Sequence, residues 1–148
     1  MRYFEVVKDE CRKNPNVEIQ LPTRATEHSA GYDFYSPIDV TIEPGKSCLI
    51  FTDVKAHMYY DNVLMLYVRS SMGKHPVVIA NGTGIIDCDY YGNVDNDGNI
   101  GLRLLNLGET PYVIKAGDRI GQGVFLKYGI TKNDDALGSR SGGFGSTN

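Results

Sequence analysis

The fold of this chain is indicated most clearly by residues 30–42, which read Ala30-Gly31-Tyr32-Asp33-Phe34-Tyr35-Ser36-Pro37-Ile38-Asp39-Val40-Thr41-Ile42. Apolar and polar residues alternate on both sides of Pro37, and this period of two is typical of half-buried β-strands. Pro37 ends the first strand, because proline has no N–H to give to a sheet. A Pro-Gly turn at residues 43–46 ends the second. We therefore expect strands at 30–36 and 38–42.

The same pattern continues outward in both directions from this stretch. Only residues 70–75 have the composition of a helical turn or two. Many short strands separated by turn residues are typical of an all-β sandwich or barrel, and we expect such a domain at residues 1–131. The further strands are expected at residues 3–7, 17–21, 48–54, 63–68, 77–80, 100–105, 112–114 and 120–126.

Composition excludes several classes of protein. A chain of 148 residues can bury a core without disulfides or metals. Cys11, Cys48 and Cys88 share no metal-binding spacing and are expected to be reduced thiols in a cytoplasmic protein. A net charge of −3 argues against a nucleic-acid partner. Without a long apolar run or a charged leader, we expect no membrane partner either.

The chemistry of the chain is concentrated in residues 80–92, which read Ala80-Asn81-Gly82-Thr83-Gly84-Ile85-Ile86-Asp87-Cys88-Asp89-Tyr90-Tyr91-Gly92. Glycines beside a polar Asn suit a hairpin that turns back or approaches a ligand closely. Asp87 and Asp89 would share one face of an extended chain. Two carboxylates so close need separate roles, or a cation or water between them. A solvated acidic turn remains the alternative explanation.

The last residues, 132–148, have a different composition from the rest. Glycines and the absence of a β pattern predict a mobile arm, and a disordered terminus is the simplest interpretation. Yet this arm contains one arginine, one aromatic ring and several hydroxyls among its glycines. An aromatic ring can cover a base, while arginine and hydroxyl groups can bind phosphate oxygens. A lid that closes over a nucleotide is the second interpretation.

Five short motifs together resemble the trimeric deoxyuridine triphosphatases, the dUTPases, and they occur in that family's order over nearly the whole chain. They are residues 30–34 (Ala-Gly-Tyr-Asp-Phe), 69–71 (Arg-Ser-Ser), 81–92, 117–122 (Gly-Asp-Arg-Ile-Gly-Gln) and 142–147 (Gly-Gly-Phe-Gly-Ser-Thr). The resemblance implies a distorted jelly-roll or β-barrel fold. It also implies hydrolysis of dUTP to dUMP and pyrophosphate, with Mg²⁺ on the triphosphate. The implied assembly is a homotrimer with shared active sites, in which the arm comes from a different subunit than the third motif.

The resemblance also implies roles for individual residues. Asp87 resembles the carboxylate that orients and deprotonates the water attacking the α-phosphorus. Tyr90 resembles the ring on which the deoxyribose stacks, leaving no room for a ribose 2′-hydroxyl. Asn81 and the backbone around Gly84 resemble the edge that reads uracil. Asp33 resembles the residue that holds Mg²⁺ through water.

The other implied contacts concern the phosphates and the lid. Phe144 resembles the ring that covers the uracil. The remaining expected substrate contacts are Arg69, Ser70, Ser71 and Gln122 around the phosphates, Ile86 and Gly145 within the motifs, and Arg140, Ser146 and Thr147 as γ-phosphate clamps. Asp118 and Arg119 are expected to pair with each other or with nearby backbone to fix a turn.

The chain departs from the family's pattern at a few positions. Arg140 lies four residues before Phe144 where five is usual, Tyr91 replaces the usual Arg or Gln, and Val68 replaces a common proline. Residues 94–99 resemble an insertion that lengthens the tip beyond the third motif, and we interpret them as a loop without calcium-binding spacing. Two alternatives stay open. One is a non-catalytic nucleotide-sensing or protein-binding module on the same fold. The other is a dCTP deaminase, whose third motif carries a glutamate base.

Overall fold

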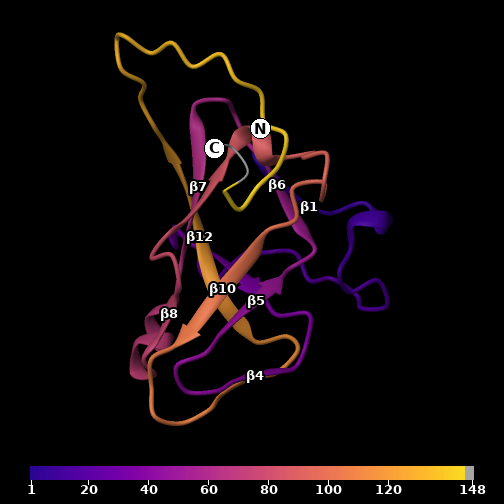
Figure 1. Cartoon of the computed structure of the whole chain (residues 1–148), viewed down its shortest axis with the longest axis vertical. Helices are drawn as coiled ribbons and strands as arrows, with labels where there is room; N and C mark the ends of the chain where they lie inside the picture. Colours follow the sequence, from indigo (N-terminus) through magenta and orange to yellow (C-terminus); the bar gives the residue numbers. More distant parts are fainter. Residues whose placement is uncertain (146–148) are drawn as a thin grey trace.

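The computed structural model describes residues 1–145, and within them every regular element except three short 3-10 turns is a β-strand. Figure 1 shows β7 and β12 running along the long axis of the molecule, crossed by β10 and β5. The expectation of an all-β fold is therefore confirmed. The strands are β1 (Tyr3–Val6), β2 (Thr23–Arg24), β3 (Tyr32–Tyr35), β4 (Val40–Ile42), β5 (Ser47–Phe51), β6 (Val54–His57), β7 (Asn62–Tyr67), β8 (Val77–Ile79), β9 (Gly84–Asp87), β10 (Gly101–Asn106), β11 (Tyr112–Ile114) and β12 (Arg119–Lys127). The 3-10 turns are η1 (Asp9–Cys11), η2 (Ser70–Lys74) and η3 (Cys88–Tyr90).

The strands form four separate antiparallel sheets in the described part of the chain, and these do not close into one barrel. The largest has the order β2-β3-β12-β7-β9, and the second has the order β5-β10-β8. Two small pairs, β1-β6 and β4-β11, complete the layers. Since β9 is the last strand of the largest sheet, one of its edges has no neighbouring strand there. That free edge positions the candidate site described below.

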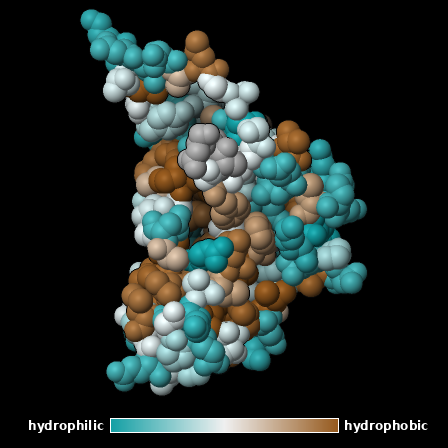
Figure 2. Space-filling view, viewed as in Figure 1, coloured by the Kyte–Doolittle hydropathy of each residue, from teal (hydrophilic) through white to brown (hydrophobic). Residues whose placement is uncertain are grey.

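One continuous apolar core lies between the sheets. Strand β10 shows how alternation builds it: Leu102 and Leu104 are buried, whereas Arg103 between them is exposed. Phe34 of β3 and Leu64 of β7 are fully buried against the same core. Burial of a Leu or Phe side chain contributes about 1.5–3 kcal/mol, so such strands drive folding. Figure 2 shows apolar residues along the middle of one face of the molecule, with polar residues beside them.

The strand expected at residues 17–21 is wrong. Val17 and Ile19 are half-buried and their neighbours exposed, so the alternating pattern does report which side chains face inward. The backbone, however, has local partners instead of a neighbouring strand. Val17 N–H donates to the carbonyl of Asn14, and the Arg12 guanidinium donates to the Val17 carbonyl. Half-burial alone therefore did not distinguish a strand from an extended loop.

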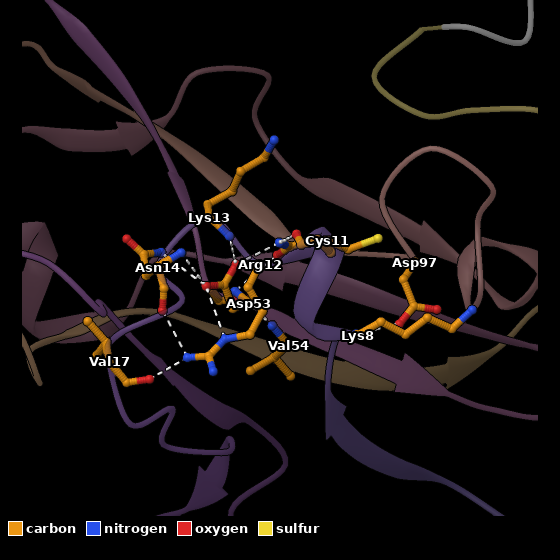
Figure 3. Close-up of polar contacts among 11 residues, drawn as sticks. Lys8, Cys11, Arg12, Lys13, Asn14, Val17, Asp53, Val54 and Asp97 are labelled. Carbon is orange, nitrogen blue, oxygen red and sulfur yellow. Dashed lines mark hydrogen bonds and ion pairs between the residues drawn. The ribbon is translucent and has the colours of Figure 1, made fainter.

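The single strand expected at residues 48–54 is two strands, β5 and β6. The break falls at Asp53, which has a φ of 57° and is fully buried. Its carboxylate accepts hydrogen bonds from the backbone N–H groups of Lys13 and Asn14, each at 2.8 Å. Figure 3 shows Asp53 surrounded by this N-terminal segment. These bonds hold Asp53 in a left-handed conformation that a non-glycine residue seldom adopts.

No helix among the described residues is long and apolar enough to cross a membrane. The expected helical turn at residues 70–75 is confirmed as η2, a 3-10 turn. The expectation that no other segment would be helical is wrong, because η1 and η3 are 3-10 turns as well.

Candidate active site

The segment at residues 80–92 connects two sheets and is not a hairpin, which corrects the sequence-based expectation. Strand β8 before it pairs with β10, whereas β9 after it pairs with β7. Between them, residues 80–83 cross from one sheet to the other. A cavity of about 660 Å³ opens at this crossing, with apolar walls from β7, β8 and β10. A volume of this size is typical of small-molecule sites.

Strand β9 presents its free edge to that cavity. Residues Gly84 to Asp87 all line the cavity, and Asn81 lines it just before the strand. Gly84 is required where β9 meets β7, because a Cβ there would lie 2.9 Å from the Cβ of Leu66. An edge strand carries unpaired N–H and C=O groups, which can hydrogen-bond a planar polar ligand. The structure thus combines a row of backbone donors and acceptors with an apolar cavity wall.

Asp87 and Asp89 both contact Arg140 of the C-terminal arm. Arg140 Nη2 donates to Asp87 Oδ2 at 2.6 Å, and Arg140 Nε donates to Asp89 Oδ1 at 2.7 Å. The chain is not extended between the two carboxylates, since β9 ends at Asp87 and η3 begins at Cys88. Of the alternatives left open by the sequence, separate roles or a cation or water between the carboxylates, the structure has a cation, Arg140, in contact with both. The hydrogen bond that Arg140 donates to Asp89 raises the pKa of Arg140; burial opposes this shift, and the negative charges of Asp89 and Asp87 add to it.

Tyr90 lines the same cavity and is almost completely buried. The Arg140 guanidinium carbon lies 5.8 Å from the centre of its ring. Burial raises the pKa of the Tyr90 phenol, and a hydrogen bond from Asn96 opposes this shift. The phenol is therefore neutral at physiological pH, and its ring is a fixed apolar surface in the cavity wall.

The arm lies over its own chain's cavity. Phe144 and Gly145 line the cavity, and the Phe144 ring meets Phe51 edge-on with centroids 5.8 Å apart. Phe144 remains 65% exposed, so its ring sits at the rim. The resemblance implies an arm exchanged between subunits, whereas in this single chain the arm contacts its own Asp87. Ser146 and Thr147 lie outside the described residues.

A second group of expected site residues surrounds Asp33, and we call it the Arg69 cluster. Arg69 Nε lies 2.6 Å from Asp33 Oδ1, and Arg119 Nε lies 3.5 Å from Asp33 Oδ2. Arg69 also donates to Ser71 Oγ at 3.4 Å. Asp33 is only 5% exposed, and a buried charge needs a partner. The two guanidinium groups compensate it. Arg69, Ser71 and Arg119 line a separate cavity of about 520 Å³.

The neighbours of this Arg69 cluster are held by backbone contacts. Gln122 Nε2 donates to the Val68 carbonyl at 3.1 Å, which ties β12 to the turn before Arg69. Asp118 Oδ2 accepts from the Lys115 N–H at 2.8 Å, so the expected backbone pairing of Asp118 is confirmed. Arg119 pairs with Asp33 instead of Asp118, which was not foreseen. Ser70 is exposed at the start of η2.

Asp87 and the Arg69 cluster lie at opposite ends of β7. Asp87 is paired with Val63 at one end, while Arg69 follows Tyr67 at the other end. From residue 63 to residue 69 an extended chain advances about 20 Å, at about 3.3 Å per residue. None of the residues 1–145 lines both cavities. Within one chain, therefore, Asp87 and Arg69 cannot contact the same phosphate group.

Arg103 and Leu102 also line the Asp87 cavity, and sequence reasoning missed both. They come from β10, whose alternating pattern was interpreted only as a strand. A single exposed arginine between buried leucines was the available signal. It is a weak signal, because an exposed charge on a half-buried strand is ordinary.

The described residues contain no set of three or more His, Cys, Asp or Glu side chains that could enclose a metal ion. Asp33 already has a guanidinium near each carboxylate oxygen, so a metal ion held there would be contacted through water. This donor set fits Mg²⁺ carried mainly by phosphate oxygens and water, as that ion prefers.

Comparison with known proteins identifies relatives over nearly the full chain. The dUTPase family model matches residues 17–148. The deoxyuridine 5′-triphosphate nucleotidohydrolase of Lactococcus lactis is 42% identical over 150 aligned positions, covering 99% of this chain and 97% of the relative. The crystal structure of dUTPase from Streptococcus mutans covers 86% of this chain and 97% of its own, with 37% identity and a TM-score of 0.75. A dUTPase from phage phi11 of S. aureus, with a coordinated structural Mg(II) ion, shares the fold at 22% identity and a TM-score of 0.73, covering 93% of this chain and 97% of its own.

Proposed function

Because this chain belongs to the dUTPase family and is a dUTP diphosphatase, we propose that it hydrolyses dUTP at the Asp87 cavity by attack of an Asp87-activated water on the α-phosphate. The observation that carries this proposal is the position of Asp87 at the end of β9, where a free strand edge, a buried tyrosine ring and a carboxylate face one cavity. Base, sugar and phosphate would meet these three features in that order.

The free edge of β9 suits uracil. Uracil presents an N–H donor between two carbonyl acceptors, and a strand edge presents N–H and C=O groups that can complement them. Asn81, Gly84 and Ile86 line the cavity along this edge and are the proposed base contacts. Cytosine reverses the donor at N3 and the acceptor at C4, so it would leave buried groups unpaired. Phe144 at the rim is the proposed cover for the base.

Tyr90 is the proposed platform for the deoxyribose. Its ring is buried in the cavity wall, so a sugar stacked on it leaves little space on the ring side. A ribose would place its 2′-hydroxyl against this surface. Selectivity for the deoxy sugar then comes from exclusion, and no specific attraction is needed.

Asp87 is the proposed general base. Its side chain is 50% exposed, so a water molecule can reach it from the cavity. As a carboxylate it can orient this water and accept its proton while the oxygen attacks phosphorus. The α-phosphorus gains the water oxygen and loses the bridging oxygen to pyrophosphate, so the products are dUMP and pyrophosphate. Arg140 must release Asp87 before this step, and phosphate oxygens are the acceptors it would take instead.

The Arg69 cluster is the proposed site of the phosphate chain. Arg69, Ser70, Ser71 and Gln122 supply positive charge and polar groups in and beside the second cavity. When bound, Mg²⁺ would neutralise the charge of the triphosphate, with Asp33 in contact through water. Gly145 and the residues Ser146 and Thr147 beyond the described part are the proposed contacts from the arm.

Asp87 and the Arg69 cluster are about 20 Å apart in one chain. The complete site is therefore proposed to form between subunits of a homotrimer. Asp87 of one subunit would face the Arg69 cluster of a neighbour. Residues 128–139 are exposed and form no strand, so the arm has the freedom to reach the cavity of another subunit.

The test is pyrophosphate release from dUTP, dCTP, dTTP and UTP in H₂¹⁸O. We expect turnover of dUTP alone at a high rate, with ¹⁸O in dUMP and none in pyrophosphate. Label in pyrophosphate would place the attack on the β-phosphorus and contradict the proposed step. Conversion of dCTP to dUTP would instead indicate a deaminase, and binding of dUTP without turnover would indicate a sensor.

A further inference from the structure

The loop at residues 93–99 closes around the hydroxyl group of Tyr90. Tyr90 Oη donates to the carbonyl oxygen of Asn99 at 3.0 Å and accepts from Asn96 Nδ2 at 2.8 Å. A tyrosine hydroxyl has one proton to donate, and this proton is used by Asn99. The far end of the ring is thereby held from two directions. The third motif ends before this loop, so no role for it was predicted from the sequence.

The amide of Asn96 has only one orientation that satisfies its neighbours. Its Oδ1 accepts from the Gly98 N–H at 3.0 Å and from Asn93 Nδ2 at 2.9 Å. Because a backbone N–H can only donate, the atom facing it must be the oxygen, and Nδ2 must face Tyr90. Gly98 permits this close approach: with φ at +83°, its Cβ would lie 2.4 Å from the Tyr90 carbonyl oxygen.

The loop is itself fixed to the protein interior. Asp97 is 3% exposed and pairs with Lys55 Nζ at 2.8 Å and with the Lys8 N–H at 2.9 Å. Asn99 exchanges two hydrogen bonds with Asp53, at 2.7 and 3.0 Å. Figure 3 shows Asp97 beside Lys8, and Asp53 with the N-terminal segment around it. Buried bonds of this kind distinguish the loop from an ordinary mobile surface turn.

We propose that Asn96 is a positioning residue that, with the carbonyl of Asn99, braces the Tyr90 ring so that it excludes a ribose 2′-hydroxyl. Exclusion requires a surface that does not yield. A ring free to move by about a few tenths of an ångström would admit the extra oxygen at little cost in free energy. A ring held in place imposes the full steric penalty. This inference rests on the proposed function, because it requires the sugar to lie against Tyr90.

The experiment compares kcat/KM for dUTP and for UTP in four variants. Asn96→Ala removes the donor, Tyr90→Phe removes its acceptor and keeps the ring, and a double variant removes both. Asp95→Ala is the matched control, since Asp95 is an exposed carboxylate of the same loop. Loss of one neutral hydrogen bond corresponds to about a five-fold change in an equilibrium. We expect the dUTP/UTP ratio to fall about five-fold in Asn96→Ala, to fall further in Tyr90→Phe, which loses the bonds to both Asn96 and Asn99, and not to fall in Asp95→Ala.

The double variant separates a brace from a general loss of structure. If Asn96 acts through Tyr90, the double variant should lose no more selectivity than Tyr90→Phe alone. Thermal unfolding identifies any variant that does not fold. If Asn96→Ala does not fold, Tyr90→Phe alone tests the brace, because it leaves the hydrogen bonds within the loop intact. An unchanged ratio in an active Tyr90→Phe variant overturns the brace and leaves the dUTPase function standing. Absence of dUTP hydrolysis by the wild-type chain overturns both.

Discussion

Arg140 donates from Nη2 to Oδ2 of Asp87 across 2.6 Å, so the proposed general base is also the anchor of the C-terminal arm. The second bond, from Arg140 Nε to Asp89, makes this a two-point contact. Both carboxylates are about half exposed, and such an ion pair contributes at most about 1 kcal/mol to stability. In the proposed mechanism, a contact this weak exchanges its carboxylates for phosphate oxygens when the triphosphate enters, and the arm would then close on the substrate.

Arg140→Ala should therefore impair catalysis much more than folding. A charged hydrogen bond to substrate contributes about 1.5–3 kcal/mol, which corresponds to a loss of about 10- to 100-fold in kcat/KM for dUTP. The free energy of unfolding should change by less than about 1 kcal/mol. Lys132→Ala, an exposed cation in the same arm, is the control and should keep both values near wild type. Equal kinetics for the two variants would exclude a substrate contact by Arg140.

Much of the fold could be predicted because apolar alternation reports burial directly. The runs around Phe34, Leu64 and Leu102 became strands close to the expected limits. Residues 17–21 show where this reasoning fails, because alternation says which side chains face inward but not which backbone pairs with which. The break at Asp53 had no signal in its own neighbourhood. Its partners, Lys13 and Asn14, come from 40 and 39 residues earlier in the chain.

Removing one partner of the buried pair Lys55 and Asp97 should be strongly destabilising. Lys55→Ala leaves the Asp97 carboxylate buried without its cation, and breaking such a pair costs about 3–5 kcal/mol. Lys115→Ala is the matched control, because Lys115 and Asp39 form an ion pair in which both side chains are more than 60% exposed. That variant should lose less than about 1 kcal/mol. Urea unfolding at neutral pH measures both, and equal losses would contradict the structural role of the buried pair.

Asp97 should also make stability depend on acid pH. Burial by itself would raise the pKa of Asp97, but hydrogen bonds from Lys55 and the Lys8 N–H hold it below its ordinary value of 3.8. Because the folded pKa is the lower one, the carboxylate stabilises the fold fully above pH 3.8. This contribution is lost as the pH falls through the folded pKa.

The measurement is urea unfolding of wild type and Asp97→Asn between neutral pH and about pH 3. We expect Asp97→Asn to be less stable at neutral pH, with a difference that shrinks below pH 3.8. Asp95→Asn, in the same loop but exposed, should follow the wild-type curve. A difference between wild type and Asp97→Asn that stays constant with pH would show that the charge of Asp97 is not involved.

The sequence could predict which residues belong to the candidate site, but it could not predict how those residues are arranged in space. Motif resemblance selected Asp87, Tyr90, Arg140 and Phe144, and these do line one cavity. It also selected Arg69 and Ser71, which line another. Their separation depends on strand register along β7, which short motifs do not encode. The hydrogen bonds of Asn96 and Asn99 to Tyr90 were missed for a different reason, since a polar loop gives no sign that its asparagines point inward.

A site shared between subunits can be tested by complementation. Asp87→Asn chains and Arg69→Ala chains should each be nearly inactive alone. Unfolded together in equal amounts and refolded, they should form mixed trimers in which about one site in four has both residues intact, restoring about a quarter of the wild-type activity. Native mass spectrometry confirms the mixing. Mixed trimers without any recovery would require Asp87 and Arg69 to act within one chain, which contradicts the distance along β7.

The central claim, that Asp87 activates the attacking water, is tested most directly by pyrophosphate release from dUTP in Asp87→Asn. The amide keeps the shape of the side chain but cannot accept a proton, so we expect kcat to fall by about 10²–10⁴. Binding of a non-hydrolysable dUTP analogue and the unfolding temperature should remain close to wild type. Asp89→Asn is the control, because Asp89 shares the contact with Arg140 but is not the proposed base. A kcat for Asp87→Asn within a few-fold of wild type, or equal losses in Asp87→Asn and Asp89→Asn, would contradict the claim.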